Sequence, residues 1–229
     1  MDARWLPPAE RTWLIDRLAT ERLARVGVAE ASVVKALTSG MVWWLAILYF
    51  LAIAAELGPI FFGPALVADA LHISGMQVGL VMGGIGLAGV AGMLVNGALS
   101  DRKQERIGHA AIPMLIMAIG FAMSAIAQQG VMVVVGLAVI SFSVNAFLPV
   151  FWCLPAALLS GSAAAGGIAL INSIGNFGGF FAPNIVGLGK TMTGTYTGSL
   201  WLLGSFALVA ALMMLPVRRA PALSRRVKQ

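Results

Sequence analysis

Six long apolar stretches follow one another along this chain of 229 residues, with short polar segments between them. A helix needs about 20 mostly apolar residues to cross the hydrocarbon core of a bilayer. The stretches lack the alternation of apolar and polar residues that marks strands, and open sheet edges do not occur in lipid. The pattern therefore predicts an all-α membrane protein with transmembrane helices at residues 42–64, 78–99, 110–127, 131–158, 166–188 and 199–217.

Composition agrees with a chain that lies mostly in lipid. Hydrophobic residues make up 59% of the sequence and charged residues only 10%, and the mean hydropathy is +0.91. A soluble domain carries roughly a quarter charged residues, far more than this chain has. The single cysteine, Cys153, excludes an intrachain disulfide, and no cluster of metal-ligating residues is present in the sequence. We expect no metal and no cofactor.

The basic residues indicate an orientation in the membrane. Of the 15 Lys and Arg residues, all but Lys190 lie before the first stretch, in the loop at 100–109, or after the last stretch. Loops rich in Lys and Arg stay in the cytoplasm. We therefore expect a multi-pass protein of the inner membrane with both termini and the 100–109 loop in the cytoplasm. This distribution accounts for the net charge of +6, so nucleic acid is not expected as a partner.

The sequence divides into three regions. Residues 1–40 are an amphipathic cytoplasmic segment, in which Pro7-Pro8 precedes a predicted helix that places Leu14 and Leu18 on one face. Residues 41–217 hold the six-helix transmembrane bundle, and residues 218–229 form a basic cytoplasmic tail.

Two patterns that resemble catalytic or nucleotide-binding motifs fail in their context. The sequence GIGLAG at 84–89 matches G-x-G-x-x-G, but it lies inside a predicted span with no strand before it. Its glycines, with Gly79 and Gly83, instead let another helix approach closely. Serines cluster at 160–162, but the two histidines, His72 and His109, lie near helix ends, so no nucleophile–base pair is evident. We expect no enzymatic activity.

The charged loop carries the most specific motif. Residues 97–106 read GALSDRKQER, which resembles the cytoplasmic loop signature of the major facilitator superfamily. It is still more similar to the form found in the second half of the anion:cation symporter family. Gln104 stands where glycine is usual in that signature, and Ile107 stands where a further arginine is usual. The matching residues are Gly97, Ser100, Asp101, Arg102, Glu105 and Arg106.

Other segments extend this resemblance over nearly the whole chain. Residues 149–187 resemble the tenth helix, short loop and eleventh helix of that family, WLPPAERTWL its central loop, and VWWLAILYF the start of its seventh helix. The resemblance implies one half, the C-terminal six-helix bundle, of a twelve-helix major facilitator fold. It also implies that the charged loop is a conformational latch onto a helix end of the opposite half, with Asp101, Arg102, Glu105 and Arg106 as its residues.

Polar residues inside the predicted helices are the candidates for a substrate site. Transporters bind substrate near the bilayer midplane between two halves, where glycine or proline often interrupts a helix. Asn172 and Asn176 are one turn apart and share a helix face. Asn145 lies four residues before Pro149, and Tyr49 lies inside the first span. Each of these side chains could bind substrate or could hold two helices together.

Glu56 is the one acidic residue well inside a predicted span. An ionised carboxylate at that depth costs several kcal/mol. Glu56 therefore either faces a water-filled cavity, where it binds a proton or cation, or is buried and neutral. Gly58 and Pro59 follow directly and are expected to interrupt the helix, which favours the cavity.

The resemblance implies a secondary active transporter that couples protons to a small organic anion, such as a sugar acid or an aromatic carboxylate, by alternating access. The bilayer and a matching N-terminal six-helix half are the expected partners. The alternative is a self-sufficient six-helix protein that pairs with a second copy of itself, as a channel or as a subunit that does not transport.

Overall fold

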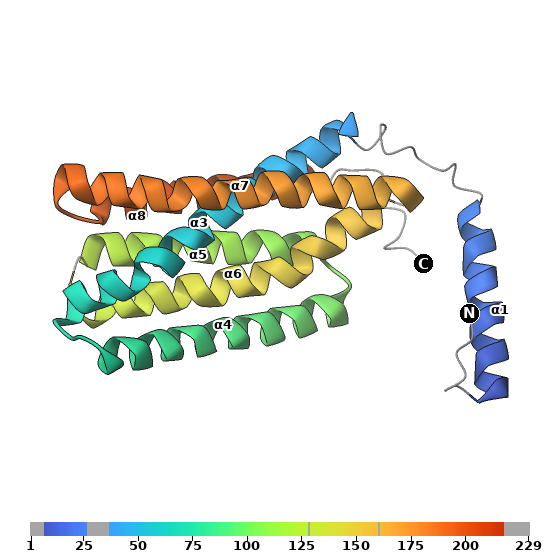
Figure 1. Ribbon diagram of the computed structural model, residues 1–229, viewed down its shortest axis with the longest axis horizontal. Coiled ribbons are helices and arrows are strands. Elements are labelled where there is room, and N and C mark those ends of the chain that lie inside the picture. The colour runs from blue at the N-terminus through green and yellow to red at the C-terminus, as the bar shows by residue number, and fades with distance from the viewer. Residues whose placement is uncertain (1–6, 27–36, 128, 160, 218–229) are drawn as a thin grey trace.

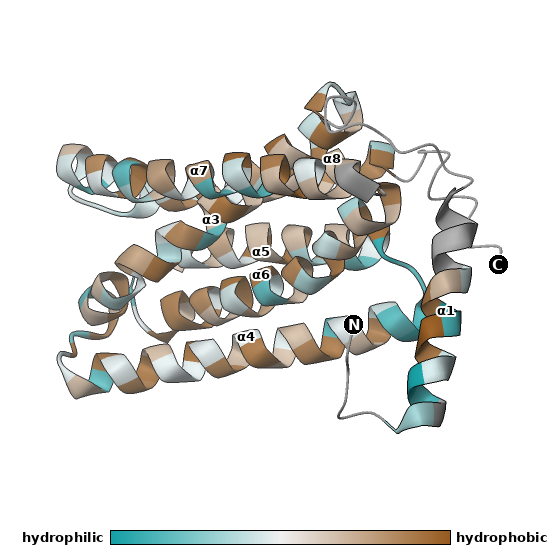
Figure 2. Ribbon diagram, turned by 45° about the vertical axis from the view of Figure 1, so that its right-hand side comes forward, coloured by the Kyte–Doolittle hydropathy of each residue, from teal (hydrophilic) through white to brown (hydrophobic). Residues whose placement is uncertain are grey.

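The computed structural model describes residues 7–26, 37–127, 129–159 and 161–217, which form seven helices (Figure 1). Six of them pack side by side as a bundle in which successive helices run in opposite directions, and α1 lies beyond one end with its axis across the bundle (Figures 1 and 2). All six predicted spans fall inside the helices of the bundle. The helices are α1 (Pro8–Val26), α3 (Gly40–Leu71), α4 (Met76–Lys103), α5 (Ile107–Ala127), α6 (Val131–Leu158), α7 (Gly161–Thr193) and α8 (Thr197–Val217).

By length and composition, five of the described helices could each cross a membrane. They are α3, α4, α5, α6 and α8. The sixth, α7, is 33 residues long and packs along α3, but asparagines at 172, 176 and 184 and several glycines lower its hydropathy. Polar side chains at membrane depth usually face another part of the protein or a cavity and not lipid. The membrane bundle of six helices agrees with one half of a major facilitator fold.

One detail of the first span differs from the prediction. Gly58 and Pro59 were expected to interrupt the helix, but α3 continues through Pro59 and Pro64 to Leu71. Proline is tolerated inside membrane helices because neighbouring groups and small local adjustments satisfy the freed carbonyl oxygens. Glu56 therefore lies at the middle of an unbroken helix that runs from Gly40 to Leu71.

Glycines bring the helices of the bundle into contact. Lipid is as apolar as a leucine side chain, so membrane helices associate through close packing at small residues. Gly120 of α5 and Gly136 of α6 face each other, and a Cβ atom added to Gly120 would lie 2.8 Å from the Gly136 carbonyl oxygen. Gly92 of α4 lies directly against the Phe142 carbonyl of α6, and Gly178 of α7 against the backbone of α3. A side chain at any of these positions would push two helices apart.

Only some of the glycines in α4 pack against another helix of the bundle. Gly89 packs against α6, as the sequence predicts, but an added Cβ atom at Gly79, Gly83 or Gly86 would have no neighbour within 4 Å in the described part of the chain. These three positions leave a face of α4 uncovered. A role for them in close approach of a helix from another bundle stays a prediction.

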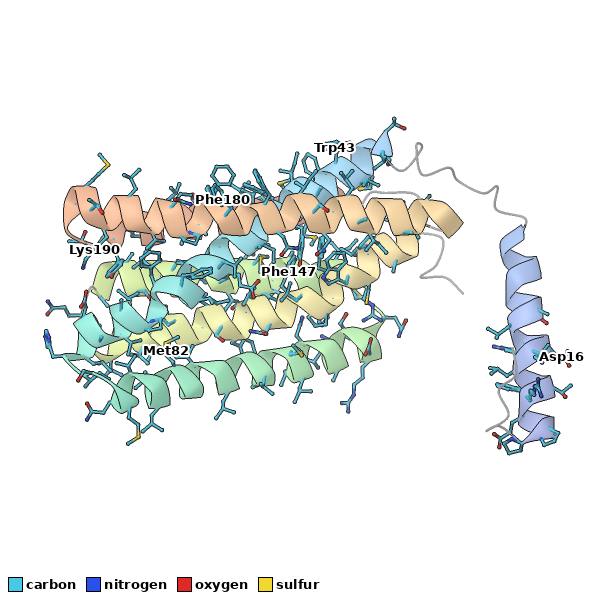
Figure 3. The ribbon with its side chains drawn as sticks, viewed as in Figure 1. Asp16, Trp43, Met82, Phe147, Phe180 and Lys190 are labelled. Atoms are coloured by element: carbon cyan, nitrogen blue, oxygen red, sulfur yellow. The ribbon has the colours of Figure 1, made fainter. Side chains whose placement is uncertain are left out.

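The bundle has two chemically different ends. The turn between α4 and α5 carries a charged cluster, and we call this the Asp101 end. The opposite end contains the C-terminus of α7 with Lys190, which Figure 3 labels there, and we call it the Lys190 end. Between them the interior is apolar, with fully buried side chains such as Phe121, Phe147 and Met117.

Candidate functional site

A cavity of about 290 Å³ opens between α3, α4 and α6, halfway along the bundle. Three polar side chains line it, Glu56 from α3 and Ser141 and Asn145 from α6. Apolar side chains, among them Met82 of α4 and Ile140 of α6, form the rest of its wall. A largely apolar cavity with a few convergent polar groups is typical of a site for a small molecule. The structure thus brings together two residues predicted separately, Glu56 and Asn145.

Glu56 is the acidic group of this cavity. Its side chain is partly buried, and it makes no hydrogen bond or ion pair with any residue that the structure describes. No lysine or arginine lines the cavity beside it. A carboxylate at the middle of a membrane helix without a countercharge is costly when ionised, because the bilayer centre disfavours charge. The surroundings of Glu56 therefore favour its protonated form or a bound cation.

Asn145 supplies amide groups to the same cavity. One N–H of its side chain donates to the Ser141 carbonyl oxygen at 2.9 Å, one turn earlier on α6. The carbonyl oxygen of the side chain has no partner among the described residues. Gly89 makes room for Asn145, since a Cβ atom there would lie 2.7 Å from the Asn145 amide nitrogen. The close approach of α4 at this glycine thus helps to shape the polar wall of the cavity.

Tyr49 lies outside this lining, in an aromatic cluster between α3, α6 and α7. Its side chain is buried, with its ring stacked on Phe151 at 4.9 Å between centroids and with an edge contact to Trp152 at the same distance. Gly175 of α7 packs directly on the Tyr49 ring. The structure therefore gives Tyr49 a packing role and does not bring it to the cavity wall.

Asn172 and Asn176 lie on an exposed face of α7, away from the cavity lining. The Asn176 side-chain amide donates to the Asn172 backbone carbonyl at 2.8 Å and to its side-chain oxygen at 2.9 Å. The same exposed face continues to Phe180, which Figure 3 labels, and to Asn184, which the sequence analysis did not single out. These asparagines are therefore available to a partner or ligand outside this bundle.

The charged cluster at the Asp101 end is built from contacts within the chain. Arg106 donates from Nη1 to Asp101 Oδ1 at 2.6 Å and to the Ser100 hydroxyl at 3.1 Å, and that hydroxyl donates to the Glu105 carbonyl at 2.8 Å. Asp101 remains exposed, with 68% of its side chain accessible to solvent. Arg102 is exposed in the last turn of α4, where a cation complements the helix dipole.

Glu105 caps the start of α5. Its carboxylate oxygens accept hydrogen bonds from the backbone N–H of Gly108 at 2.8 Å and of His109 at 3.2 Å, and one of them contacts His109 Nδ1 at 3.0 Å. Partial burial acts to raise the pKa of the Glu105 carboxyl, but these hydrogen bonds and the His109 side chain outweigh it, so the pKa is lowered. Glu105 thus stabilises the α4–α5 turn in its ionised form.

Two further contacts tie the cluster to the bundle. The Asn96 side-chain amide donates to the His109 carbonyl of α5 and to the Ala146 carbonyl of α6, both at 2.7 Å.

Gln104, which stands where glycine is usual, ends α4 with φ at 51°, in the left-handed region that glycine adopts without strain. The residue type at this position therefore differs from the family pattern, but the backbone keeps the left-handed conformation that favours glycine.

The fold is that of a multi-pass membrane protein, and comparison with known proteins identifies its family. The model of the Major Facilitator Superfamily matches residues 12–228. The chain is 34% identical over 218 residues to a putative tartrate transporter of Agrobacterium vitis, covering 95% of this chain and 48% of that protein. It is 35% identical over 217 residues to the inner membrane transport protein RhmT of Escherichia coli K12, which covers 94% of this chain and 50% of that protein.

A quinolone resistance transporter of Acinetobacter baumannii is 30% identical over 200 residues, which cover 87% of this chain and 46% of that protein. The chain belongs to the Major Facilitator Superfamily, which confirms the resemblance drawn from the charged loop. It spans about half the length of the curated relatives that it matches. All three of these relatives are named as transport proteins.

Proposed function

We propose that this bundle is the C-terminal half of a secondary active transporter that carries a small organic anion together with protons. The observation that supports this most strongly is the cavity at the middle of the bundle, where Glu56 and Asn145 meet without a basic residue in the lining. The relatives named for tartrate transport support a small organic acid, such as a sugar acid, as the substrate.

The chemistry of the cavity supports coupling of the anion to a proton. An anion that enters beside an ionised Glu56 is repelled, because two negative charges at short range in a weakly polar site interact strongly. When Glu56 Oε takes up a proton, the repulsion is removed and the carboxyl O–H becomes a hydrogen-bond donor to the anion. Asn145 offers its second amide N–H from the opposite wall. Loss of the proton on the other side of the membrane then favours release of the anion.

The second half of the site lies outside this bundle. Alternating access requires a second bundle against which this one rocks. The exposed face of α7 with Asn172 and Asn176, and the uncovered glycines of α4, are the surfaces that we assign to that contact. In the assembled transporter, we expect loss of either asparagine side chain to weaken substrate binding by roughly 5- to 150-fold, the effect of losing a desolvated hydrogen bond of about 1–3 kcal/mol.

The Asp101 end is assigned to the cytoplasm, with both termini on the same side of the inner membrane. There Asp101 and Arg102 are exposed and can reach a helix end of the opposite bundle, while Glu105 and Arg106 hold the turn that presents them. We assign the latch to this pair of exposed residues. We further assign residues 1–40 to the central loop between halves, and the basic tail 218–229 to the cytoplasm.

Reconstitution tests this proposal. The chain is placed in proteoliposomes alone or together with the first six-helix half of the Agrobacterium vitis relative, and uptake of labelled tartrate is measured under an inward proton gradient. We expect concentrative uptake only when both halves are present, and its collapse when a protonophore dissipates the gradient. Robust uptake by the chain alone would overturn the half-transporter assignment and favour a self-sufficient homodimer.

A further inference from the structure

A second polar cavity, of about 220 Å³, opens at the Lys190 end of the bundle. Its lining comes from four helices and two connecting turns, and it contains Asp69 of α3, Gln129, Lys190 of α7, and the hydroxyl groups of Thr195 and Thr197. None of these residues lines the Glu56 cavity. The turn between α4 and α5, which carries the charged cluster, lies at the opposite end of the bundle from Lys190 (Figures 1 and 3).

Lys190 is held at the mouth of this cavity in a defined position. Its Nζ donates to Asp69 Oδ2 at 3.1 Å and lies 4.2 Å from the centroid of the Tyr196 ring. An ammonium group carries three N–H donors. One of them faces Asp69 and the aromatic face attracts the charge, so donors remain for a ligand. Both charged side chains are accessible, with 39% of Lys190 and 59% of Asp69 exposed.

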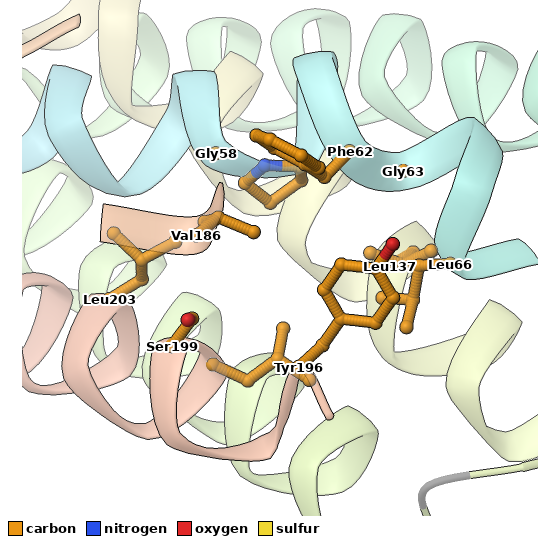
Figure 4. Close-up of a pocket in the computed structure, with 11 residues that line it drawn as sticks. Gly58, Phe62, Gly63, Leu66, Leu137, Val186, Tyr196, Ser199 and Leu203 are labelled. Atoms are coloured by element: carbon orange, nitrogen blue, oxygen red, sulfur yellow. The ribbon is translucent and has the colours of Figure 1, made fainter. Parts of the chain in front are cut away.

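The floor of the cavity separates it from the Glu56 cavity. Leu66, Tyr196 and Leu200 line both this cavity and a tight apolar space beneath it, which holds only about 10 Å³ and is lined further in by Pro59 and Leu137 (Figure 4). Pro59 and Leu137 in turn belong to the wall of the Glu56 cavity. The three spaces thus follow one another along the bundle, and packed apolar side chains close the middle one.

We propose that the Lys190 cavity is a binding site for a small hydroxycarboxylate. The ammonium group of Lys190 would bind the carboxylate, and Asp69 would accept hydrogen bonds from the hydroxyl groups of the same ligand. A carboxylate without hydroxyl groups is bound less well, because Asp69 then only repels it. This inference rests on the proposed function in its choice of organic anions, and it gives the assembled transporter a second site at the end opposite the charged cluster.

The position of Lys190 explains why an anion would reach this site. Lys190 is the one lysine or arginine at this end among the residues that the structure describes. Asp69 offsets this charge at longer range, so the anion is attracted at close range, through the N–H donors of Lys190 that Asp69 does not use. The apolar floor then holds the ligand at the mouth until the packing around Tyr196 and Leu66 changes.

Binding to the full chain in lipid nanodiscs tests this site, with gluconate as the probe and calorimetry as the measurement. Sorbitol has the hydroxyl groups without the carboxylate, propionate has the carboxylate without the hydroxyl groups, and serine is a zwitterion. We expect gluconate to bind best of the four. Because a charge-assisted hydrogen bond is lost, Lys190→Gln should weaken gluconate binding roughly tenfold or more, while Lys190→Arg retains most of it.

Asp69→Asn distinguishes a binding site from a structural tie between α3 and α7. It frees Lys190 from its partner and removes the repulsion, so propionate should bind more tightly and the preference for gluconate over propionate should shrink. Unchanged binding of both ligands in the Lys190 and Asp69 variants would show that the ion pair only joins helices and would overturn the proposal. Tighter binding of serine than of gluconate would overturn the ligand class.

A control variant separates this inference from the proposed function. Lys190→Gln should weaken gluconate binding by the same factor in the Glu56→Gln background as in the parent chain, because the apolar floor separates the two cavities. Binding that is lost in Glu56→Gln and kept in Lys190→Gln would overturn the Lys190 site and leave the transport proposal intact. Binding that depends on Lys190, together with no tartrate uptake by the assembled halves, would overturn the transport proposal alone.

Discussion

Glu105 at the Asp101 end and Glu56 in the central cavity have opposite surroundings. Glu105 accepts hydrogen bonds from two backbone N–H groups and contacts His109, all within a turn of its own position. Glu56 lies at the middle of α3 beside a cavity, with no hydrogen bond to a described residue. The same side chain thus fixes the backbone where partners are supplied, and we propose that it binds a proton or ligand where they are withheld.

The difference extends to the groups around each glutamate. At the Asp101 end, Ser100, Asp101 and Arg106 contact one another, so the polar groups of the turn are largely used within the chain. In the cavity, Asn145 uses one N–H on the Ser141 carbonyl, and the remainder of its amide group has no partner among the described residues. A fully connected polar network stabilises structure, whereas groups left without partners at a cavity wall are typical of a ligand site.

The largest effect is expected where one contact supports both regions. Gly92 of α4 lies against the Phe142 carbonyl of α6, between the cavity wall and the charged cluster. Gly92→Ala should force α4 away from α6 and lower the stability of the chain by about 3 kcal/mol, in the range of overpacking a core. Gly84→Ala is the matched control, since an added Cβ atom there meets nothing within 4 Å. Thermal unfolding in detergent measures both, and equal stability of the two variants would contradict the close contact.

The next effect separates the two glutamates directly. Glu56→Gln should change the pH dependence of uptake by the assembled transporter without loss of stability, because it removes the group that binds the proton. Glu105→Gln should leave the pH profile of uptake as it is and lower the stability by about 1 kcal/mol, the usual value of a helix cap. An unchanged pH profile in Glu56→Gln, at normal expression, would remove Glu56 from the coupling mechanism.

The stability effect at Glu105 should itself depend on pH. The folded protein lowers the pKa of this carboxyl, so its contribution is fully present above the pKa of the unfolded chain. As the pH falls through the lowered pKa of the folded state, the contribution disappears. The difference in stability between the parent and Glu105→Gln should therefore shrink in acid, and thermal unfolding between neutral and acidic pH measures it.

The sequence predicted the helices well, because length and hydropathy determine which segments can cross lipid. The long apolar stretches predicted all six helices of the bundle, and the charged loop placed Asp101 and Arg106 in one turn. The continuous helix through Pro59 was missed, since tolerance of proline depends on neighbouring helices that a single segment does not reveal. The meeting of Glu56 with Asn145, 89 positions apart in the sequence, likewise depends on the packing of α3 on α6. Asp69 was missed because its partner, Lys190, lies on another helix.

The smallest expected effect concerns Gln104 and the backbone of the charged turn. Its φ of 51° lies in the left-handed region, which costs a residue with a side chain about 1 kcal/mol relative to glycine. The Gln104 side-chain amide donates to the Asp101 carbonyl at 2.7 Å, but this bond is exposed to solvent and adds little. Gln104→Gly should therefore raise the stability of the chain by up to about 1 kcal/mol, which thermal unfolding can detect. Gln77, an exposed glutamine in the first turn of α4, is the matched control. Its backbone is helical, so Gln77→Gly should lower the stability, because glycine there only adds freedom to the unfolded chain. A loss of stability of the same size in Gln104→Gly would show that the side-chain hydrogen bond outweighs the backbone strain.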